Sequence, residues 1–334
     1  MTNRERITRS IRFEQTDYLP HHISFTSQSY EKVAAAFGAD YDKKINNHMT
    51  RFKLRKPKEP VGEGLVQDEF GVIFNLNGPD KDIGYVENYQ IKTWEDFEQY
   101  AFPPADKDYL HARAKDLVST PDTNFRGFEM SFSLFERLWS LMGMEDALSN
   151  MIIDPELVHS ILQKACRRNL DVLDTVLSYD FDYVLFGDDW GQQQELIMGP
   201  HHWRTFIKPY VSQLYARVRQ AGKFVIQHSC GDNRKIMDDL YEIGLNVYQT
   251  FQPEIYGLDY AEILRGKIAI WGGISTQRDL ASKTPEELRV VIRETLDTFR
   301  ETGGLIAAPT HDLPYDVPVE NVEAMVDMFL HQNA

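Results

Sequence analysis

The sequence has little cysteine, no long hydrophobic run and no excess of basic residues. Two cysteines among 334 residues exclude a disulfide framework and favour a reduced, cytoplasmic setting. The apolar runs have the length of buried strands and are far too short to cross a bilayer. Because the first residues are polar and charged, we expect neither a signal peptide nor a membrane segment there.

The charge balance narrows the range of partners. Lys and Arg number 36 against 51 for Asp and Glu, which gives a net charge of −15. Nucleic acid binding requires clustered basic side chains, so this balance argues against it, and against an anionic membrane surface. The chain is 42% hydrophobic and 26% charged, the usual mixture of a folded globular protein. We therefore expect a chain that folds throughout and binds neither nucleic acid nor an anionic membrane.

Beyond about residue 155 the chain alternates short β-branched or aromatic runs with helical patterns. Five runs predict strands, at residues 182–186, 224–228, 246–249, 268–271 and 305–308. The intervals between them leave room for crossover helices, which is typical of a parallel sheet. Helices are predicted to begin at the capping pairs Asp154-Pro155 and Thr284-Pro285, and the last helix is predicted over residues 319–330.

The first 150 residues are less regular. They predict helices at residues 3–12 and 30–37, strands at 19–25 and 126–131, and a loop-rich stretch at 53–79. These strands bring the count towards the eight of a (β/α)8 TIM barrel. The sequence thus predicts one barrel domain over residues 1–334, with an irregular, decorated amino-terminal region. A doubly wound open sheet is the alternative, although no Gly-x-Gly-x-x-Gly follows a strand.

The residues that follow the predicted strands carry the chemistry, because a parallel barrel places its reacting groups at the carboxyl ends of its strands. Side chains two positions apart on a strand point the same way, so His228 and Cys230 can reach one ion. Imidazole and thiolate are preferred zinc ligands, and a catalytic zinc keeps three protein ligands. His311, after the last strand, is the natural third ligand, and Asp312 is a weaker substitute.

Ordinary structural interpretations stand beside this one. A histidine at a strand end usually only forms hydrogen bonds, and a lone cysteine usually packs as a small core residue. Cys166 lies among aliphatic residues on a helical face and is expected in the core. Asp188 and Asp189 are also compatible with a charge pair at a helix amino terminus or with a loop brace. Trp271 and Tyr248 are expected to pack rather than to hold substrate.

An ordered set of motifs resembles the uroporphyrinogen decarboxylase superfamily. The set comprises FGDDWG (186–191), MGP (198–200), FIKPY (206–210), HSCG (228–231), WGGI (271–274) and DVPVENV (316–322), with NRER (3–6) and DYLP (17–20) at the start. The motifs extend over nearly the whole chain and are densest after residue 180. The resemblance implies a (β/α)8 barrel, in agreement with the strand pattern.

Two activities compete within that superfamily. The decarboxylases are metal-free and grip a polyanionic substrate with an arginine-rich amino-terminal motif, whereas residues 19–26 contain no arginine here. The resemblance is therefore stronger to the cobalamin-dependent methyltransferases, which hold zinc with His-x-Cys and one later ligand. His228 and Cys230 match that motif. The third ligand is commonly a cysteine shortly before Pro-x-Glu-Asn, where this sequence has His311, and imidazole in place of thiolate makes the zinc centre a stronger Lewis acid.

The methyltransferase resemblance implies a small methylated substrate, such as a methoxy compound undergoing O-demethylation, and a separate corrinoid protein as partner. No Asp-x-His-x-x-Gly motif of a corrinoid-binding domain is present. Asp188, Asp189 and Glu129 are candidates for orienting a zinc ligand or the substrate. The direction of transfer stays open, as does a homodimer.

Two other hypotheses remain at this stage. One is a metal-free lyase of the decarboxylase type, acting on a small carboxylated compound with Asp188 or Asp189 as its polar centre. The other is a binding protein without catalytic activity that has kept the barrel.

Overall fold

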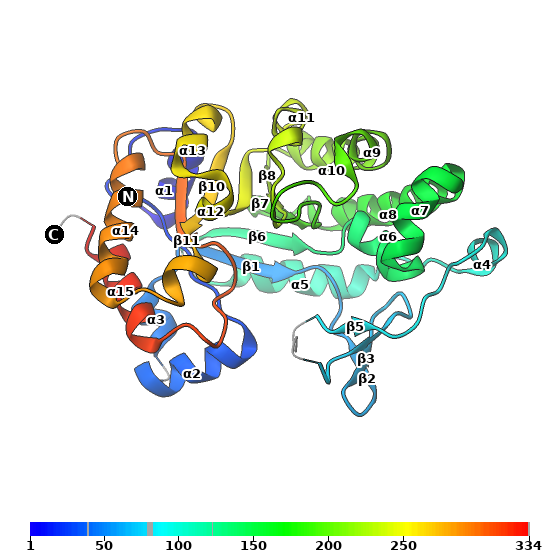
Figure 1. Cartoon of the computed structure of the whole chain (residues 1–334), viewed down its shortest axis with the longest axis horizontal. Helices are drawn as coiled ribbons and strands as arrows, with labels where there is room; N and C mark the ends of the chain where they lie inside the picture. Colours follow the sequence, from blue (N-terminus) through cyan, green and yellow to red (C-terminus); the bar gives the residue numbers. More distant parts are fainter. Residues whose placement is uncertain (39, 79–82, 122, 333–334) are drawn as a thin grey trace.

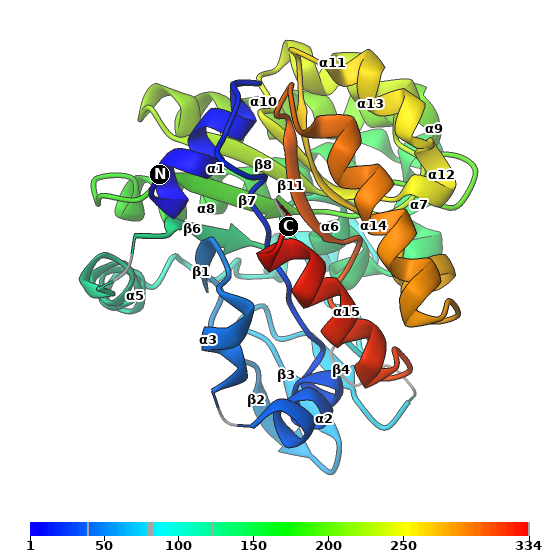
Figure 2. The same ribbon diagram turned by 90° about the vertical axis from the view of Figure 1, so that its left-hand side faces the viewer.

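A computed structural model describes residues 1–38, 40–78, 83–121 and 123–332 of the chain. Its centre is a curled parallel sheet with helices packed around the outside (Figures 1 and 2). Seven strands are neighbours in chain order: β1 (Met49–Lys53), β6 (Phe125–Met130), β7 (Tyr183–Gly187), β8 (Phe224–His228), β9 (Val247–Phe251), β10 (Ala269–Ile274) and β11 (Leu305–Pro309). The five strands predicted after residue 155 and the one predicted at 126–131 are confirmed as β6 to β11.

An extended segment closes the sheet between β11 and β1. The Ala307 amide of β11 donates to the Pro20 carbonyl at 2.8 Å, and the His22 amide donates back to Ala307 at 3.0 Å. On the other side, the His48 amide donates to the His21 carbonyl at 3.2 Å. The strand predicted at 19–25 therefore occupies the eighth position through isolated bridges. The (β/α)8 barrel is confirmed, and the doubly wound alternative is wrong.

The helices surround the barrel, and the two whose caps were predicted begin at those caps, at Pro155 and Pro285. Their bounds are α1 (Asn3–Ile11), α2 (Ser27–Phe37), α3 (Tyr41–Ile45), α4 (Trp94–Gln99), α5 (Lys107–Ser119), α6 (Phe135–Met142), α7 (Met144–Ile153), α8 (Pro155–Val176), α9 (Gly199–His202), α10 (Lys208–Gln220), α11 (Met237–Glu242), α12 (Pro253–Tyr256), α13 (Leu258–Leu264), α14 (Pro285–Phe299) and α15 (Val319–Leu330). The Thr284 hydroxyl accepts from the Glu287 amide at 3.3 Å, which completes the predicted capping box of α14. None of the described helices combines the length and apolar character that a membrane crossing requires.

The stretch predicted as loop-rich at 53–79 instead forms most of a small antiparallel sheet. Its strands are β2 (Glu59–Gly62), β3 (Leu65–Gln67), β4 (Ile73–Asn75) and β5 (Tyr85–Val86), and it projects beside the barrel (Figure 2). These strands have two to four residues and little alternation of apolar and polar side chains, so the periodicity on which strand prediction depends is absent. Strand β1 was also missed.

The barrel interior is filled with apolar side chains towards the amino-terminal ends of the strands and with polar side chains towards their carboxyl ends. The buried interior cluster contains Met49, Phe125, Tyr183, Leu185, Ile226, Val247, Ala269, Trp271, Ile306 and Ala308, together with Ile7 and Ile11 of α1. Helix α1 therefore closes the barrel at the amino-terminal ends of its strands (Figure 2). His228 lies two positions beyond Ile226 on β8. Because side chains alternate along a strand, His228 is on the same face as Ile226 and lies at the open, carboxyl end of the barrel. Cys166 is buried in the surrounding core, as predicted.

Candidate metal centre

Three predicted ligands converge at the carboxyl end of the barrel. The ligand atoms of His228, Cys230 and His311 all lie within 4.8 Å of one another. The Sγ of Cys230 is 3.7 Å from Nε2 of His228, and the two imidazole rings are 5.5 Å apart. Zinc bonds of about 2.3 Å to sulfur and about 2.0 Å to nitrogen at a tetrahedral angle would hold such a pair roughly 3.5 Å apart. The donor set and its spacing therefore fit one zinc ion.

Gln249 orients the first of these ligands. Its side-chain oxygen binds Nδ1 of His228, and the two residues are paired in register on β9 and β8. This hydrogen bond leaves Nε2 of His228 directed towards Cys230. A partner on the second ring nitrogen is the usual means of fixing a metal-binding histidine. Sequence reasoning missed Gln249, although its place at the end of the adjacent strand is a signal that could have found it.

The backbone around Cys230 is held from several sides. The Cys230 amide donates to Oδ1 of Asp189 at 2.8 Å, and the same oxygen is 3.5 Å from Nε2 of His228. The Asn233 side chain donates to the Cys230 carbonyl at 3.1 Å. Gly231 has a φ of +78°, and a Cβ there would lie 2.3 Å from the backbone of Gly191. The loops after β7 and β8 thus pack against each other so closely that only glycine fits.

The Cys230 thiol and the His228 imidazole favour each other's charged forms. Burial lowers the pKa of His228, but the charge and hydrogen bond of Cys230 outweigh it and raise the pKa to about 10. Burial raises the pKa of the Cys230 thiol, and His228 then lowers it to about 7. The pKa of His311 is raised, chiefly by its hydrogen bond with Cys230. The sulfur is therefore readily available as a thiolate, the form that binds metals.

Asp188 lies apart from the three ligands and holds a helix in place. Its fully buried carboxylate accepts from the Phe135 amide at 2.9 Å and the Glu136 amide at 2.8 Å, at the start of α6. The indole of Trp190 donates to it at 2.7 Å. Burial raises the pKa of Asp188 to about 6, and these hydrogen bonds oppose that shift. Of the two aspartates, only Asp189 reaches the ligands directly.

Glu129 lies beside a cation in the barrel mouth. Its carboxylate accepts from Ser131 and is 3.4 Å from the Arg51 guanidinium of β1. Arg51 is also 3.6 Å from Asp312, which in turn accepts from Ser24. Asp312, the substitute ligand, is thus engaged by Arg51 and Ser24 rather than grouped with the other ligands. Sequence reasoning missed Arg51, because its search for a substrate-gripping arginine covered only residues 19–26.

Two further side chains near the centre were missed. Burial, followed by the charges of Asp189 and Asp188, raises the pKa of the Glu136 carboxyl well above its ordinary value. The His22 ring meets Trp271 edge-on at 5.3 Å, and burial lowers the pKa of His22 to about 3. Neither residue belongs to a recognisable motif.

The chain is similar in sequence and in fold to known proteins. The family profile described as uroporphyrinogen decarboxylase (URO-D) matches residues 68–331. The uroporphyrinogen decarboxylase of Psychromonas ingrahamii is 21% identical over 182 residues, which are 52% of this chain and 48% of that protein. The chain thus spans about half the length of this curated relative. A solved structure described as a methyltransferase from Methanosarcina mazei matches with a TM-score of 0.76 and 15% identity, covering 100% of both chains. At this identity the likeness shows a shared fold.

Proposed function

Because the chain belongs to the uroporphyrinogen decarboxylase family, we propose that it is a zinc-dependent methyltransferase of that fold. It would move a methyl group between a small methylated substrate and a separate corrinoid protein. The observation that carries this proposal is the convergence of His228, Cys230 and His311 within 4.8 Å. The proposal is further supported by the fold that the chain shares with the methyltransferase from Methanosarcina mazei.

His228, Cys230 and His311 would hold the zinc, with Gln249 fixing the His228 ring and Asp189 fixing the Cys230 backbone. When bound, zinc supplies a Lewis acid that polarises the heteroatom carrying the methyl group. Two neutral imidazoles and one thiolate leave the centre with a net charge of +1, which favours an oxygen leaving group. A methoxy compound is therefore the substrate class that we propose for O-demethylation.

The corrinoid protein would approach the open end of the barrel. His311 is exposed there, whereas α1 closes the opposite end. A reduced corrinoid on that partner would supply the nucleophile for the methyl group, and the leaving oxygen would keep the bonding electron pair. Asp188 would act indirectly by fixing α6, and Glu129 would act by setting the position of Arg51. A corrinoid partner and an available thiolate both suit a cytoplasmic enzyme.

Metal content and methyl transfer together test the proposal. Purified protein should contain about one zinc per chain, which Cys230→Ser should lose and the buried-core control Cys166→Ser should keep. With a reduced corrinoid protein and a panel of methoxylated and methylated amine substrates, the protein should convert the cobalt(I) absorption spectrum to that of methylcobalt(III). Zinc-free protein with full activity, or zinc-loaded protein without methyl transfer across the panel, would contradict the proposal.

The metal-free lyase is the second candidate, and Arg51 in the barrel mouth is the observation that favours it. A guanidinium there can bind a carboxylate, although Glu129 and Asp312 already neutralise it. Carbon dioxide release from small carboxylates by chelator-treated protein would distinguish this activity from methyl transfer.

A further inference from the structure

Three basic side chains stand in a row on the face of β1 that turns towards the barrel mouth. This basic row comprises Arg51, Lys53 and Arg55. It continues the face of Met49, which belongs to the buried interior cluster. The Leu54 amide donates to the Glu129 carbonyl of β6 at 2.9 Å, so the pairing of the two strands extends past the end of β1. Because side chains alternate along a strand, every second residue from Met49 onwards points inwards, and the row reaches the open end of the barrel.

Two carboxylates face the basic row, and both contact Arg51. Its guanidinium is 3.4 Å from Glu129 and 3.6 Å from Asp312. Burial raises the pKa of Glu129, but the charges of the whole basic row and one hydrogen bond lower it below its ordinary value. Lys53 is paired in register with Glu129, yet no ion pair of Lys53 or Arg55 is found in the described part of the chain. These two cations are therefore free to bind a further anion.

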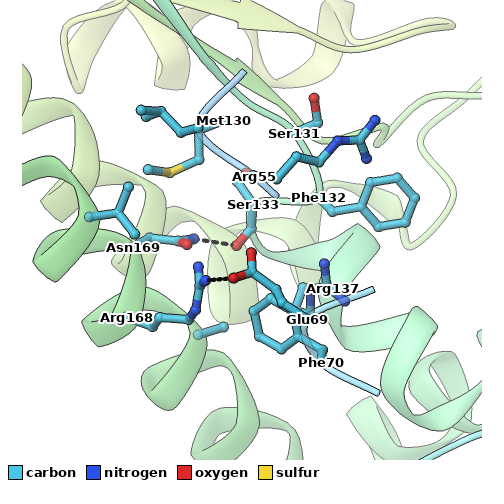
Figure 3. A pocket seen from close by; sticks show the side chains of 13 residues that line it. Arg55, Glu69, Phe70, Met130, Ser131, Phe132, Ser133, Arg137, Arg168 and Asn169 are labelled. Carbon is cyan, nitrogen blue, oxygen red and sulfur yellow. Dashed lines mark hydrogen bonds and ion pairs between the residues drawn. The ribbon is translucent and has the colours of Figure 1, made fainter. Parts of the chain in front are cut away.

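The acidic side chains behind Arg55 are engaged by other arginines. Figure 3 shows Glu69 paired with Arg168, at 2.6 Å, while Arg55 extends away from that pair. Asp68 is likewise 2.8 Å from Arg137. Each of these two carboxylates is thus matched by a cation of its own. The basic row therefore has three positive charges against two negative ones among the described residues, and one positive charge is in excess.

Three other acids at this end of the barrel lie on the side of the metal centre. Asp188 accepts from the amides at the start of α6, and Asp189 accepts from the Cys230 amide at 2.8 Å. Glu136 has its pKa raised by burial and then by the charges of these two aspartates. None of the three forms an ion pair with the basic row within the ranges that the structure describes. The excess positive charge of the row thus has no close partner.

A solvent-accessible band joins the basic row to the metal centre. Asp312, which is 3.6 Å from Arg51, directly follows the metal ligand His311 in the chain. The side chains of Arg51 and Asp312 are 22% and 38% exposed, and Lys53 and His311 are exposed at the two ends of the band. A molecule that lies across the barrel mouth can therefore contact the metal ligands at one end and the basic row at the other.

Building on the proposed methyl transfer, we propose that the basic row binds a carboxylate of the substrate, so that the methoxy compound is a methoxylated carboxylic acid. Lys53 and Arg55 would donate to the carboxylate while the methoxy oxygen lies at the metal centre. Residues two positions apart on a strand are separated by roughly 7 Å, so their long side chains can converge on one group. A guanidinium can also give a carboxylate two parallel hydrogen bonds.

The charge and the place of the row both bear on the substrate class. One excess positive charge matches a singly charged carboxylate better than a doubly charged phosphate. The row lies outside residues 19–26, the region compared with the arginine motif of the decarboxylases. The carboxylate would therefore be recognised by a different strand of the barrel from the one that carries that motif.

Ligand binding to the purified protein tests the proposal without reference to methyl transfer. The probes are methoxyacetate and the ortho-, meta- and para-methoxybenzoates, each compared with its neutral amide by calorimetry at constant ionic strength. At least one acid should bind about ten-fold more tightly than its amide. Arg55→Met should weaken binding of that acid about ten-fold and leave the amide unchanged. Arg55→Lys keeps the charge without the planar fork and should lose less.

Arg113→Met is the matched control for Arg55→Met. The Arg113 guanidinium is 32% exposed and stacks at 4.3 Å on Phe52, whose side chain points outwards from the same strand. This variant removes the same charge from the opposite face of β1, so it should leave the affinity for every acid unchanged. Equal affinities of each acid and its amide, no binding of any acid, or equal losses in the two variants would each overturn the proposal.

Methyl transfer to a reduced corrinoid protein separates this inference from the function on which it rests. For the acid that binds best, Arg55→Met should raise KM about ten-fold and leave kcat unchanged, because Arg55 would contact the carboxylate and not the methoxy group. Equal kcat/KM for the acid and its amide would overturn carboxylate recognition and leave methyl transfer standing. An acid that binds through Arg55 but never loses its methyl group would instead overturn the proposed methyl transfer and leave the carboxylate site standing.

Discussion

The Gln249 side chain holds Nδ1 of His228 across the register of β8 and β9, and so determines which nitrogen faces Cys230. We predict that Gln249→Leu lowers zinc affinity roughly 10- to 100-fold, the usual cost of losing the partner that orients a ligand. Competition with a chromophoric chelator measures the zinc affinity of both proteins. Gln332→Leu is the matched control, since Gln332 is similarly buried and hydrogen-bonded to Leu19. Equal zinc affinity of wild type and Gln249→Leu would refute the orienting role.

Gly231 permits the close contact between the loops after β7 and β8. We predict that Gly231→Ala costs more stability than Gly222→Ala and also weakens zinc binding. Both glycines have φ near +75°, at +78° and +72°, so both alanines carry a backbone penalty of roughly 1–2 kcal/mol. Only at Gly231 would the new Cβ collide with the backbone of Gly191, because nothing lies within 4 Å at Gly222. Urea unfolding and chelator competition on both variants check this, and equal losses of stability would contradict it.

Zinc binding should release more protons at low pH than at high pH. Zinc requires Cys230 as thiolate and His228 as neutral imidazole. With pKa values of about 7 for Cys230 and about 10 for His228, the pair carries one proton at pH 9 and two at pH 6. The raised pKa of His311 acts in the same direction. Calorimetric titration of zinc in buffers of different ionisation enthalpy should show about one additional proton or more at pH 6, and a constant proton count would contradict these pKa values.

Arg51 should stabilise the fold through Glu129 and Asp312. Burial raises the pKa of both carboxyls, but the charge of Arg51 leads the opposing effects and both pKa values are lowered. We predict that Arg51→Met lowers the free energy of unfolding by roughly 2–4 kcal/mol at pH 7, because it leaves buried negative charge unpaired. A carboxyl whose pKa is lowered in the folded protein stabilises the fold at pH values above its ordinary pKa. The loss of stability in Arg51→Met should therefore shrink as the pH falls below about 4.

A double-mutant cycle separates this ion pair from general packing. Arg51→Met combined with Glu129→Gln should recover part of the loss, because no unpaired charge remains at Glu129. Urea unfolding of the wild type, both single variants and the double variant gives the coupling. Strictly additive losses would show that Arg51 acts through packing alone.

The strands and helices of the barrel were predictable because their signals are local. β-branched runs such as residues 224–228 and capping residues such as Thr284 act within a few positions of the chain. The small antiparallel sheet escaped prediction because its strands are too short for periodicity. Strand β1 escaped because Arg51 and Lys53 break the apolar pattern expected of a buried strand, and only the polar mouth of a closed barrel accommodates them.

For the candidate site, the sequence alone determined that His228 and Cys230 lie together, since a strand repeats its direction every two residues. The tertiary structure decided everything that depends on strands distant in the chain. The closure of the barrel brought His311 to the pair, the register of β8 and β9 placed Gln249 behind His228, and the packing of α6 buried Asp188 away from Asp189. Contacts of this kind follow from how strands curl around a shared core, and no short-range pattern of residues encodes that arrangement.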